Sequence, residues 1–218
     1  MTPPRVAPSL PEGRRAVLYA LRRRGEATVD DLAAQLDMTV SGARQHLAAL
    51  VEDGLAEAVE LPRPAGARGR PQLAYAVTDA ADAVFPKAYG ELTNELLGYL
   101  DESDASLVDT LFERRRDQRV RNATERLERR RGLKGKVEEL ARILDEDGYL
   151  ATSERHGNGY RIVEHNCAIL AVAQKYGQAC TSEIDFIRTV LPEADVERVS
   201  HIIDGAHHCA YEITPRAA

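Results

Sequence analysis

Apolar residues recur at helical spacing in three short segments near the start of the chain, and at strand spacing in two segments that follow. In residues 12–24, 29–36 and 39–53, apolar side chains return every three or four positions, which predicts three helices. Residues 55–61 and 72–78 alternate between apolar and polar side chains, which predicts two strands. Three helices with a tight second turn, followed by a hairpin, predict a winged helix-turn-helix domain.

This domain is expected to span residues 1–78 and to present its third helix to DNA. The side chains that this helix is expected to bury are Val40, Ala43, Leu47 and Leu50. The opposite face carries Thr39, Ser41, Arg44 and Gln45. Arginine and glutamine can make paired hydrogen bonds to guanine and adenine edges, and hydroxyls at a helix N-terminus suit phosphate or base contacts.

The loop between the two predicted strands is rich in arginine. Residues 62–71 contain Arg63, Arg68 and Arg70 and no acidic residue. A basic loop of this kind suits a wing that lies along the phosphate backbone or in the minor groove. The loop and the third helix together predict binding to double-stranded DNA. The alternative interpretation is that these side chains are ordinary solvated polar residues.

Residues 79–147 are predicted to form a helical linker with a role in dimerisation. A helix that begins at Phe85 carries an apolar stripe. Because the winged-helix domain has its own core, this stripe needs another packing partner. The stripe consists of Phe85, Tyr89, Leu92, Leu96, Leu97 and Leu100. Its expected partner is the same stripe of a second subunit, which would give a homodimer that reads a palindromic operator. The alternative partner is the C-terminal domain of the same chain.

The arginine-rich segment 114–131 lies within this helical region. A second DNA-contacting surface is one interpretation of it. The interpretation that we favour is a solvated helical face that pairs with the acidic segments on either side.

Residues 148–218 mix strand and helix patterns, which predicts a small α+β domain. We expect two strands that form a hairpin, then three helices, then a final strand, at residues 150–154, 160–164, 168–176, 183–191, 195–204 and 210–213. The fold class expected for the whole chain is therefore α+β.

All three cysteines of the chain lie in this last domain, with the spacing C-x12-C-x28-C. We expect Cys167 in the first turn of a helix, where the helix dipole favours the thiolate, Cys180 in a loop and Cys209 before a strand. The wide spacing differs from the close cysteine pairs of zinc fingers. It suits an iron–sulfur cluster, with zinc as an alternative. The other interpretation is three separate buried core cysteines.

Composition narrows the classes of function. The net charge of the chain is −6, and residues 137–218 carry 14 acidic against 7 basic side chains, so we expect DNA contacts to come from the N-terminal part. No apolar stretch approaches the roughly 18 residues of a membrane helix, and no secretory signal is recognised, which predicts a cytoplasmic protein with reduced thiols. Because the sequence has no nucleophile–base pair, phosphate loop or His–Glu metal motif, we do not expect an enzyme.

From about residue 12 onward, the chain resembles the SufR family of iron–sulfur-dependent repressors. The resemblance is carried by the order of winged helix, Phe85-Pro86-x-x-Tyr89, Glu164-His165-Asn166-Cys167, Cys180 and Gly205-x-x-x-Cys209-x-Tyr211-x-Ile213. It implies a homodimeric repressor of the operon for iron–sulfur cluster assembly (suf). It also implies a cluster of the [4Fe–4S] type in the C-terminal domain.

One position departs from this resemblance. Cyanobacterial members show C-x12-C-x13-C-x14-C, and Ala194 stands where their third cysteine would be. Three thiolates then remain for four irons, and His165, two residues before Cys167, is our first candidate for the fourth ligand; the alternative interpretation of His165 is a polar histidine at the end of a strand. The other candidates are His201, His207, His208, Glu164, Asp185, a small thiol and solvent.

Two other functions fit parts of the sequence. A winged-helix regulator could instead sense zinc or a small molecule, because the ending Gly205-x-x-x-Cys209-x-Tyr211 also resembles ligand-binding domains of the vinyl-reductase type. A redox or cluster-carrier protein would use the cysteines for turnover or cluster transfer. That second alternative leaves Gln45 and the arginines of the wing without a role.

Overall fold

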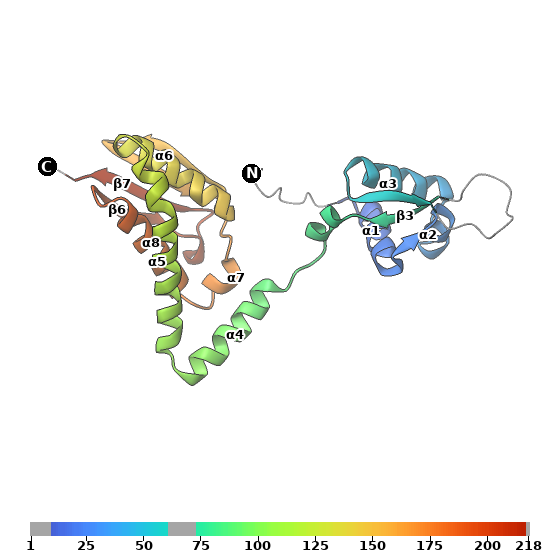
Figure 1. Ribbon diagram of the computed structural model, residues 1–218, viewed down its shortest axis with the longest axis horizontal. Helices are drawn as coiled ribbons and strands as arrows, with labels where there is room; N and C mark the ends of the chain where they lie inside the picture. Colours follow the sequence, from blue (N-terminus) through green and yellow to red (C-terminus); the bar gives the residue numbers. More distant parts are fainter. Residues whose placement is uncertain (1–9, 61–72, 217–218) are drawn as a thin grey trace. The chain divides into compact units, whose positions relative to one another are not determined.

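A computed structural model describes residues 10–60 and 73–216. The chain divides into two compact units, Arg5–Lys87 and Ala88–Ala218 (Figure 1). Helices and strands occur in both units, so the predicted α+β fold class with an N-terminal winged helix-turn-helix is confirmed.

The N-terminal unit has the order of helices and strands that the sequence pattern predicts. Its elements are α1 (Glu12–Arg24), β1 (Glu26–Ala27), α2 (Val29–Gln35), α3 (Val40–Glu52), β2 (Ala56–Glu60), β3 (Leu73–Val77) and the 3-10 helix η1 (Asp79–Val84). The strands form an antiparallel sheet of order β1-β3-β2. The predicted wing residues Arg63, Arg68 and Arg70 lie outside the described residues.

Local capping fixes the two helices of the helix-turn-helix. Thr28 accepts a hydrogen bond from the backbone N–H of Asp31, and the Asp31 carboxylate accepts one from the backbone N–H of Thr28, so the start of α2 is capped reciprocally. Thr39 caps α3 by accepting from the backbone N–H of Gly42 at 3.1 Å. Leu47 is fully buried as predicted, but Val40 is 41% exposed because it is the first residue of α3 and lies beyond the core.

The N-terminal unit extends beyond the boundary that we expected after residue 78. Ala81 of η1 is fully buried in its core, and Phe85 packs against that core with its ring centroid 5.3 Å from the ring of Tyr19. Phe85 therefore does not begin the next helix, which starts at Tyr89. A proline at position 86 fits this break, because proline disfavours helical backbone at the residue before it.

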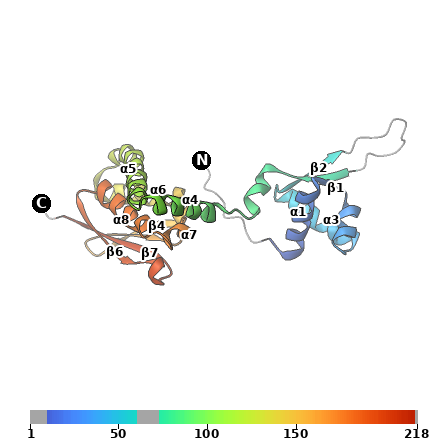
Figure 2. The ribbon, with the colours of Figure 1, turned by 90° about the horizontal axis from the view of Figure 1, so that it is seen from below.

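The C-terminal unit is an antiparallel sheet with helices packed on one face (Figure 2). Its elements are α4 (Tyr89–Ser103), α5 (Ser106–Glu128), α6 (Gly132–Leu144), η2 (Asp145–Tyr149), β4 (Ala151–His156), β5 (Gly159–Glu164), α7 (Leu170–Ala173), α8 (Gln178–Val190), β6 (Ala194–Ser200), η3 (Ile202–Asp204) and β7 (Cys209–Pro215). The strand order is β4-β5-β7-β6. The core lies between this sheet and α5, α6 and α8, so the expected helical linker belongs to this unit.

The structure differs from the predicted secondary structure at three places in this unit. The helix expected over 195–204 is strand β6 followed by η3, because residues 194–200 pair with β7. The helix expected over 168–176 is reduced to α7, so Cys167 precedes the helix. Cys180, expected in a loop, is the third residue of α8.

The arginines of α5 pair with carboxylates, as the charge pattern indicates. Arg126 contacts Glu139 and Glu146, and Arg119 contacts Asp147 and Glu183. These pairs join α5 to α6, η2 and α8 within the C-terminal unit. Among the described residues, no helix is both long and apolar enough to cross a membrane.

Candidate metal centre and DNA-contacting helix

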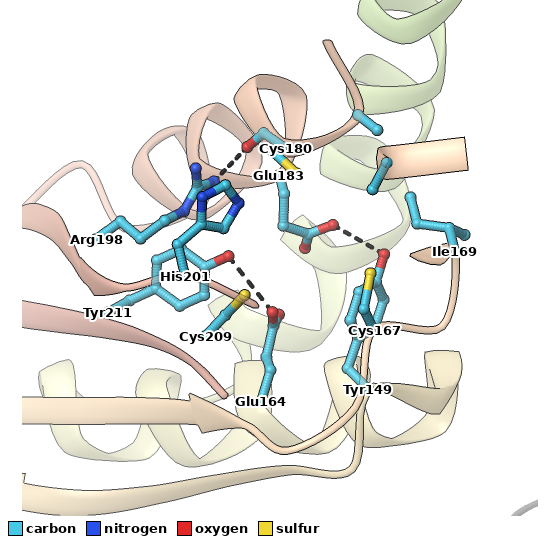
Figure 3. A pocket seen from close by; sticks show the side chains of 12 residues that line it. Tyr149, Glu164, Cys167, Ile169, Cys180, Glu183, Arg198, His201, Cys209 and Tyr211 are labelled. Carbon is cyan, nitrogen blue, oxygen red and sulfur yellow. Dashed lines mark hydrogen bonds between the residues drawn. The ribbon is translucent and has the colours of Figure 1, made fainter. Parts of the chain in front are cut away.

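The three cysteines line one pocket of the C-terminal unit. Cys167 lies in the turn between β5 and α7, Cys180 in the first turn of α8, and Cys209 at the start of β7 (Figure 3). The pocket is also lined by Tyr149, Glu164, Ile169, Ala173, Ala179, Glu183, Arg198, His201 and Tyr211. Tertiary folding therefore brings together three thiols that are far apart in the sequence.

Strand register explains why Cys209 meets its neighbours. In the antiparallel β5–β7 pair, Glu164 lies directly opposite Cys209, and in the β6–β7 pair Arg198 lies opposite Tyr211. Because paired residues share a face of a sheet, these four side chains lie on the helix-covered face. The backbone N–H of Ile202 donates a hydrogen bond to the Cys209 sulfur at 3.3 Å.

The segment of Cys167 is held by contacts with the end of η2. The Asn166 side-chain amide donates to the carbonyl oxygen of Gly148 at 2.7 Å, and the Asn166 backbone N–H donates to the carbonyl oxygen of Tyr149 at 3.1 Å. These bonds fix the turn after β5, because they satisfy backbone groups that no strand pairs. Cys167 therefore has a defined position without being part of a helix.

Burial raises the pKa of each of the three thiols. The pKa of Cys209 is raised to about 11, and those of Cys167 and Cys180 are raised as well. The backbone N–H of Ile169 lowers the pKa of Cys167, but burial has the larger effect. Our expectation that a helix dipole activates Cys167 is therefore wrong, since α7 begins only at Leu170. A bound cation favours the thiolate form of buried thiols of this kind.

A buried ion pair forms the wall of the pocket nearest to α5. The Glu183 carboxylate, on the same face of α8 as Cys180, accepts from Arg119 at 2.7 Å and from the Tyr149 hydroxyl at 3.0 Å. Its second oxygen, Oε1, is buried and has no hydrogen-bond partner among the described residues. The carboxylate of Glu183 raises the pKa of Arg119, although burial by itself lowers it.

Glu164 forms the floor of the pocket. It is 2% exposed, and its carboxyl group accepts from the Tyr211 hydroxyl at 3.4 Å. Burial, followed by the negative charge of Glu183, raises the pKa of Glu164 to about 8. Arg198 closes the same side, where its guanidinium lies 5.5 Å from the centre of the Tyr211 ring and donates to the carbonyl oxygen of Cys180.

The histidines near the cysteines differ in their positions. His201 lines the pocket, whereas His165, His207 and His208 do not. The exposed His165 lies at the end of β5, where its Nε2 is 3.3 Å from the Thr152 hydroxyl and its ring is 6.2 Å from that of His208. The structure therefore does not bring our expected fourth ligand to the cysteines.

The pocket contains several side chains that can ligate metals. Over residues 10–60 and 73–216, no three His, Cys, Asp or Glu side chains form a group that could hold a single metal ion. The pocket nevertheless presents three thiols, together with buried polar atoms of Glu164, Glu183 and His201 that lack partners among the described residues. Such a donor set fits a group with several metal atoms, because each metal atom then takes its own thiolate.

The candidate DNA-contacting residues lie together on α3. Thr39, Ser41, Arg44 and Gln45 are all exposed, whereas Ala43, Leu47 and Leu50 on the opposite face are fully buried. The Thr39 hydroxyl oxygen caps the helix but retains its proton for a contact. These exposed side chains are therefore available for contacts without any change to the core.

Comparison with known proteins bears on the N-terminal unit. Residues 11–58 match the family described as "Bacterial regulatory protein, arsR family". The match spans the helix-turn-helix, so the chain carries the DNA-binding domain of a transcriptional regulator. No curated protein and no solved structure matches the chain.

Sequence reasoning overlooked several residues of the pocket. Tyr149, Glu183 and Arg198 have no cysteine beside them in the sequence. Glu183 could have been found, because it follows Cys180 by three residues and such residues share a helix face. Arg198 could not, because its position depends on a strand that had been predicted as a helix.

Proposed function

We propose that this protein is a DNA-binding transcriptional regulator that senses an iron–sulfur cluster, and that it represses an operon for iron–sulfur cluster assembly (suf). The observation that carries the proposal is the convergence of Cys167, Cys180 and Cys209 on one pocket, in a chain that also has a helix-turn-helix. In this proposal the pocket binds the cluster, and the exposed face of α3 binds the DNA.

Three soft thiolates that come from distant parts of the sequence and line one pocket suit an iron–sulfur cluster, with zinc as the alternative. Cys167, Cys180 and Cys209 would hold the cluster, which when bound supplies a centre that oxygen, nitric oxide or iron shortage can dismantle.

A chain of contacts leads from the cysteines to an exposed apolar surface. Cys167 and Cys180 pack against a core that joins α4, α5 and α7. On α4, the Asn94 side chain donates to the carbonyl oxygen of Ala171 in α7 at 2.7 Å. Gly90 permits this close approach, because a Cβ at that position would lie 2.7 Å from the Cβ of Ala171. Movement of the Cys167 turn therefore acts on α4 through α7.

The outer face of α4 is the proposed dimer surface. Its exposed large residues are Tyr89, Leu92, Leu96 and Tyr99, each more than half exposed. The same stripe of a second copy is the occupant that we propose, because a two-fold dimer presents two copies of α3 to an inverted repeat. In this scheme the cluster-loaded pocket holds α7 and α4 in the arrangement that allows dimerisation and operator binding, and loss of the cluster releases it.

A double substitution on α4 tests the dimer surface. Leu92→Glu with Leu96→Glu places two carboxylates on this face, and we expect the mass in solution to fall from twice the 24.0 kDa chain mass to once that mass. Light scattering after anaerobic gel filtration measures it. Val51→Glu is the matched control, since Val51 is 40% exposed on α3, and it should remain dimeric. A dimeric double variant would refute this surface.

Anaerobic spectroscopy and DNA selection test the proposed function. As purified without oxygen, the protein should show broad visible absorption and about four irons and four sulfides per chain. It should also select an inverted repeat from a random-sequence duplex library, and it should lose that affinity when the cluster is removed. Colourless protein with stoichiometric zinc would contradict the proposal.

The variant Arg44→Ala separates DNA binding from cluster binding. It should keep the full iron content and lose about 1–3 kcal/mol of discrimination at one base pair per half-site. Loss of iron in this variant would show that the α3 substitution disturbs more than the contact with DNA.

A further inference from the structure

We infer that His201 is the fourth protein ligand of the cluster and binds it through Nε2. This inference rests on the proposed function, since it assigns the fourth ligand of the same pocket. His201 follows β6 and precedes η3, so it reaches the pocket from the strand next to that of Cys209. Figure 3 shows its ring among the residues that line the pocket.

The unpartnered nitrogen of His201 is the first observation that supports this inference. The His201 side chain is only 17% exposed, and its Nε2 is buried without a hydrogen-bond partner among the described residues. A buried polar atom without a partner is unfavourable, so a native protein normally supplies a partner. A metal atom in the pocket is a partner of suitable chemistry.

The other ring nitrogen is already held in the manner of a metal ligand. Nδ1 of His201 lies 3.0 Å from a carboxylate oxygen of Asp204. An ionised carboxylate can only accept, so Nδ1 carries a proton, and Nε2 is the ring nitrogen that is left to bind a metal. Histidines that bind metals usually donate their second N–H to a carboxylate or carbonyl, which fixes the tautomer and ring orientation. Asp204 is thus a positioning residue for His201.

Position 194, where cyanobacterial SufR members have their third cysteine, cannot supply this ligand. Ala194 is paired with Pro215, whereas Cys209 lies at the other end of β7. Ser200 lies six positions after Ala194 in β6, which is roughly 20 Å along a strand. A side chain at position 194 therefore points into the core at the opposite end of the sheet, and it does not line the pocket.

Glu164 is the strongest rival to His201. Its Oε1 is also buried and unpartnered among the described residues, and it lies opposite Cys209. The second oxygen of Glu164 accepts from the Tyr211 hydroxyl, so one oxygen is left for a metal, just as one nitrogen is left on His201. Histidine is favoured because it is the residue that replaces cysteine as an iron ligand in Rieske iron–sulfur centres. Glu183 is less suitable, because Arg119 and Tyr149 already share one of its oxygens.

Nitrogen detection by pulsed electron paramagnetic resonance tests the ligand directly. The full-length protein, reconstituted without oxygen from iron and sulfide and then reduced, should show a strongly coupled nitrogen that changes when histidine is labelled with ¹⁵N. His201→Ala should abolish this coupling, and His165→Ala, a substitution outside the pocket, should leave it unchanged. His201→Cys should keep a full cluster without nitrogen coupling and with a lower reduction potential, because a thiolate adds negative charge.

The outcomes separate this inference from the proposed function. A wild-type cluster without nitrogen coupling, or coupling that persists in His201→Ala, overturns the assignment of His201 while leaving the cluster in place. Loss of iron in Glu164→Gln but not in His201→Ala would assign the ligand to Glu164 instead. Absence of any cluster from the wild-type protein, or an unchanged cluster in Cys209→Ser, would overturn the proposed function and this inference with it.

Discussion

Cys209→Ser protein, purified and reconstituted without oxygen, is expected to retain less than about one iron per chain, against about four in the wild type. A serine hydroxyl is a poor substitute for a thiolate, because iron in such clusters is held by soft sulfur ligands. The substitution also removes the sulfur that accepts the Ile202 N–H. Iron and sulfide counts, together with the visible spectrum, measure the effect.

The same variant should lose operator affinity by about a hundredfold or more. A hundredfold change corresponds to about 2.7 kcal/mol, which is also the least by which cluster binding must favour the DNA-competent state. One or two misplaced phosphate contacts per half-site are enough to account for it. Binding of the selected inverted repeat at fixed salt concentration measures this loss, since salt strongly alters DNA affinity.

The control for Cys209→Ser is the metal-free protein. Cys209 is 8% exposed and belongs to the main core of the C-terminal unit, so its substitution could weaken the fold rather than the site. Equal thermal midpoints for the metal-free wild type and variant would assign the loss of iron to the missing ligand. If the variant kept both a full chromophore and cluster-dependent operator binding, the proposed function would be abandoned.

Arg119→Met is expected to lower the free energy of unfolding by about 3–5 kcal/mol. Arg119 is 12% exposed and pairs with Glu183, which is 5% exposed. Its guanidinium also lies 4.3 Å from the centre of the Phe186 ring. Without Arg119, the carboxylate of Glu183 would remain buried with only the Tyr149 hydroxyl as a partner, and that uncompensated charge accounts for most of the loss.

Two further variants identify the cause. Arg119→Met combined with Glu183→Gln should recover most of the lost stability, because the amide removes the buried charge and keeps an acceptor for Tyr149. Arg116→Met breaks a pair with the half-exposed Asp117 and should cost less than about 1 kcal/mol. Urea unfolding of the metal-free chain, followed by circular dichroism, measures all three. Similar losses for Arg116→Met and Arg119→Met would contradict the role assigned to the buried pair.

The N-terminal domain could be predicted from sequence because its elements are specified locally. The reciprocal cap of Thr28 and Asp31 involves residues three positions apart, and so does the cap of Thr39 on Gly42. The apolar spacing of α3 likewise assigns its buried and exposed faces within a single helix, with an error only at Val40. Signals of this kind act over one or two helical turns, so they survive without knowledge of the rest of the chain.

The C-terminal unit shows where local reasoning fails. Residues 194–200 are compatible with a helix when considered alone, and their pairing with β7 makes them a strand. Since sheet pairing joins segments that are distant in sequence, periodicity within one segment cannot reveal it. Proximity to Cys167 in the sequence favoured His165 over His201 in our prediction, but it does not bring His165 to the pocket.

The sequence by itself therefore determined the helix-turn-helix, the residues that it exposes on α3, and the expectation that three clustered cysteines share a site. Only the tertiary structure decided which polar groups surround those cysteines. Glu164 meets Cys209 through strand register, Glu183 meets Arg119 through helix packing, and His201 reaches the pocket from the end of β6. The physical reason is that a binding site is built from long-range pairing and packing, whereas sequence patterns report mainly on neighbours along the chain.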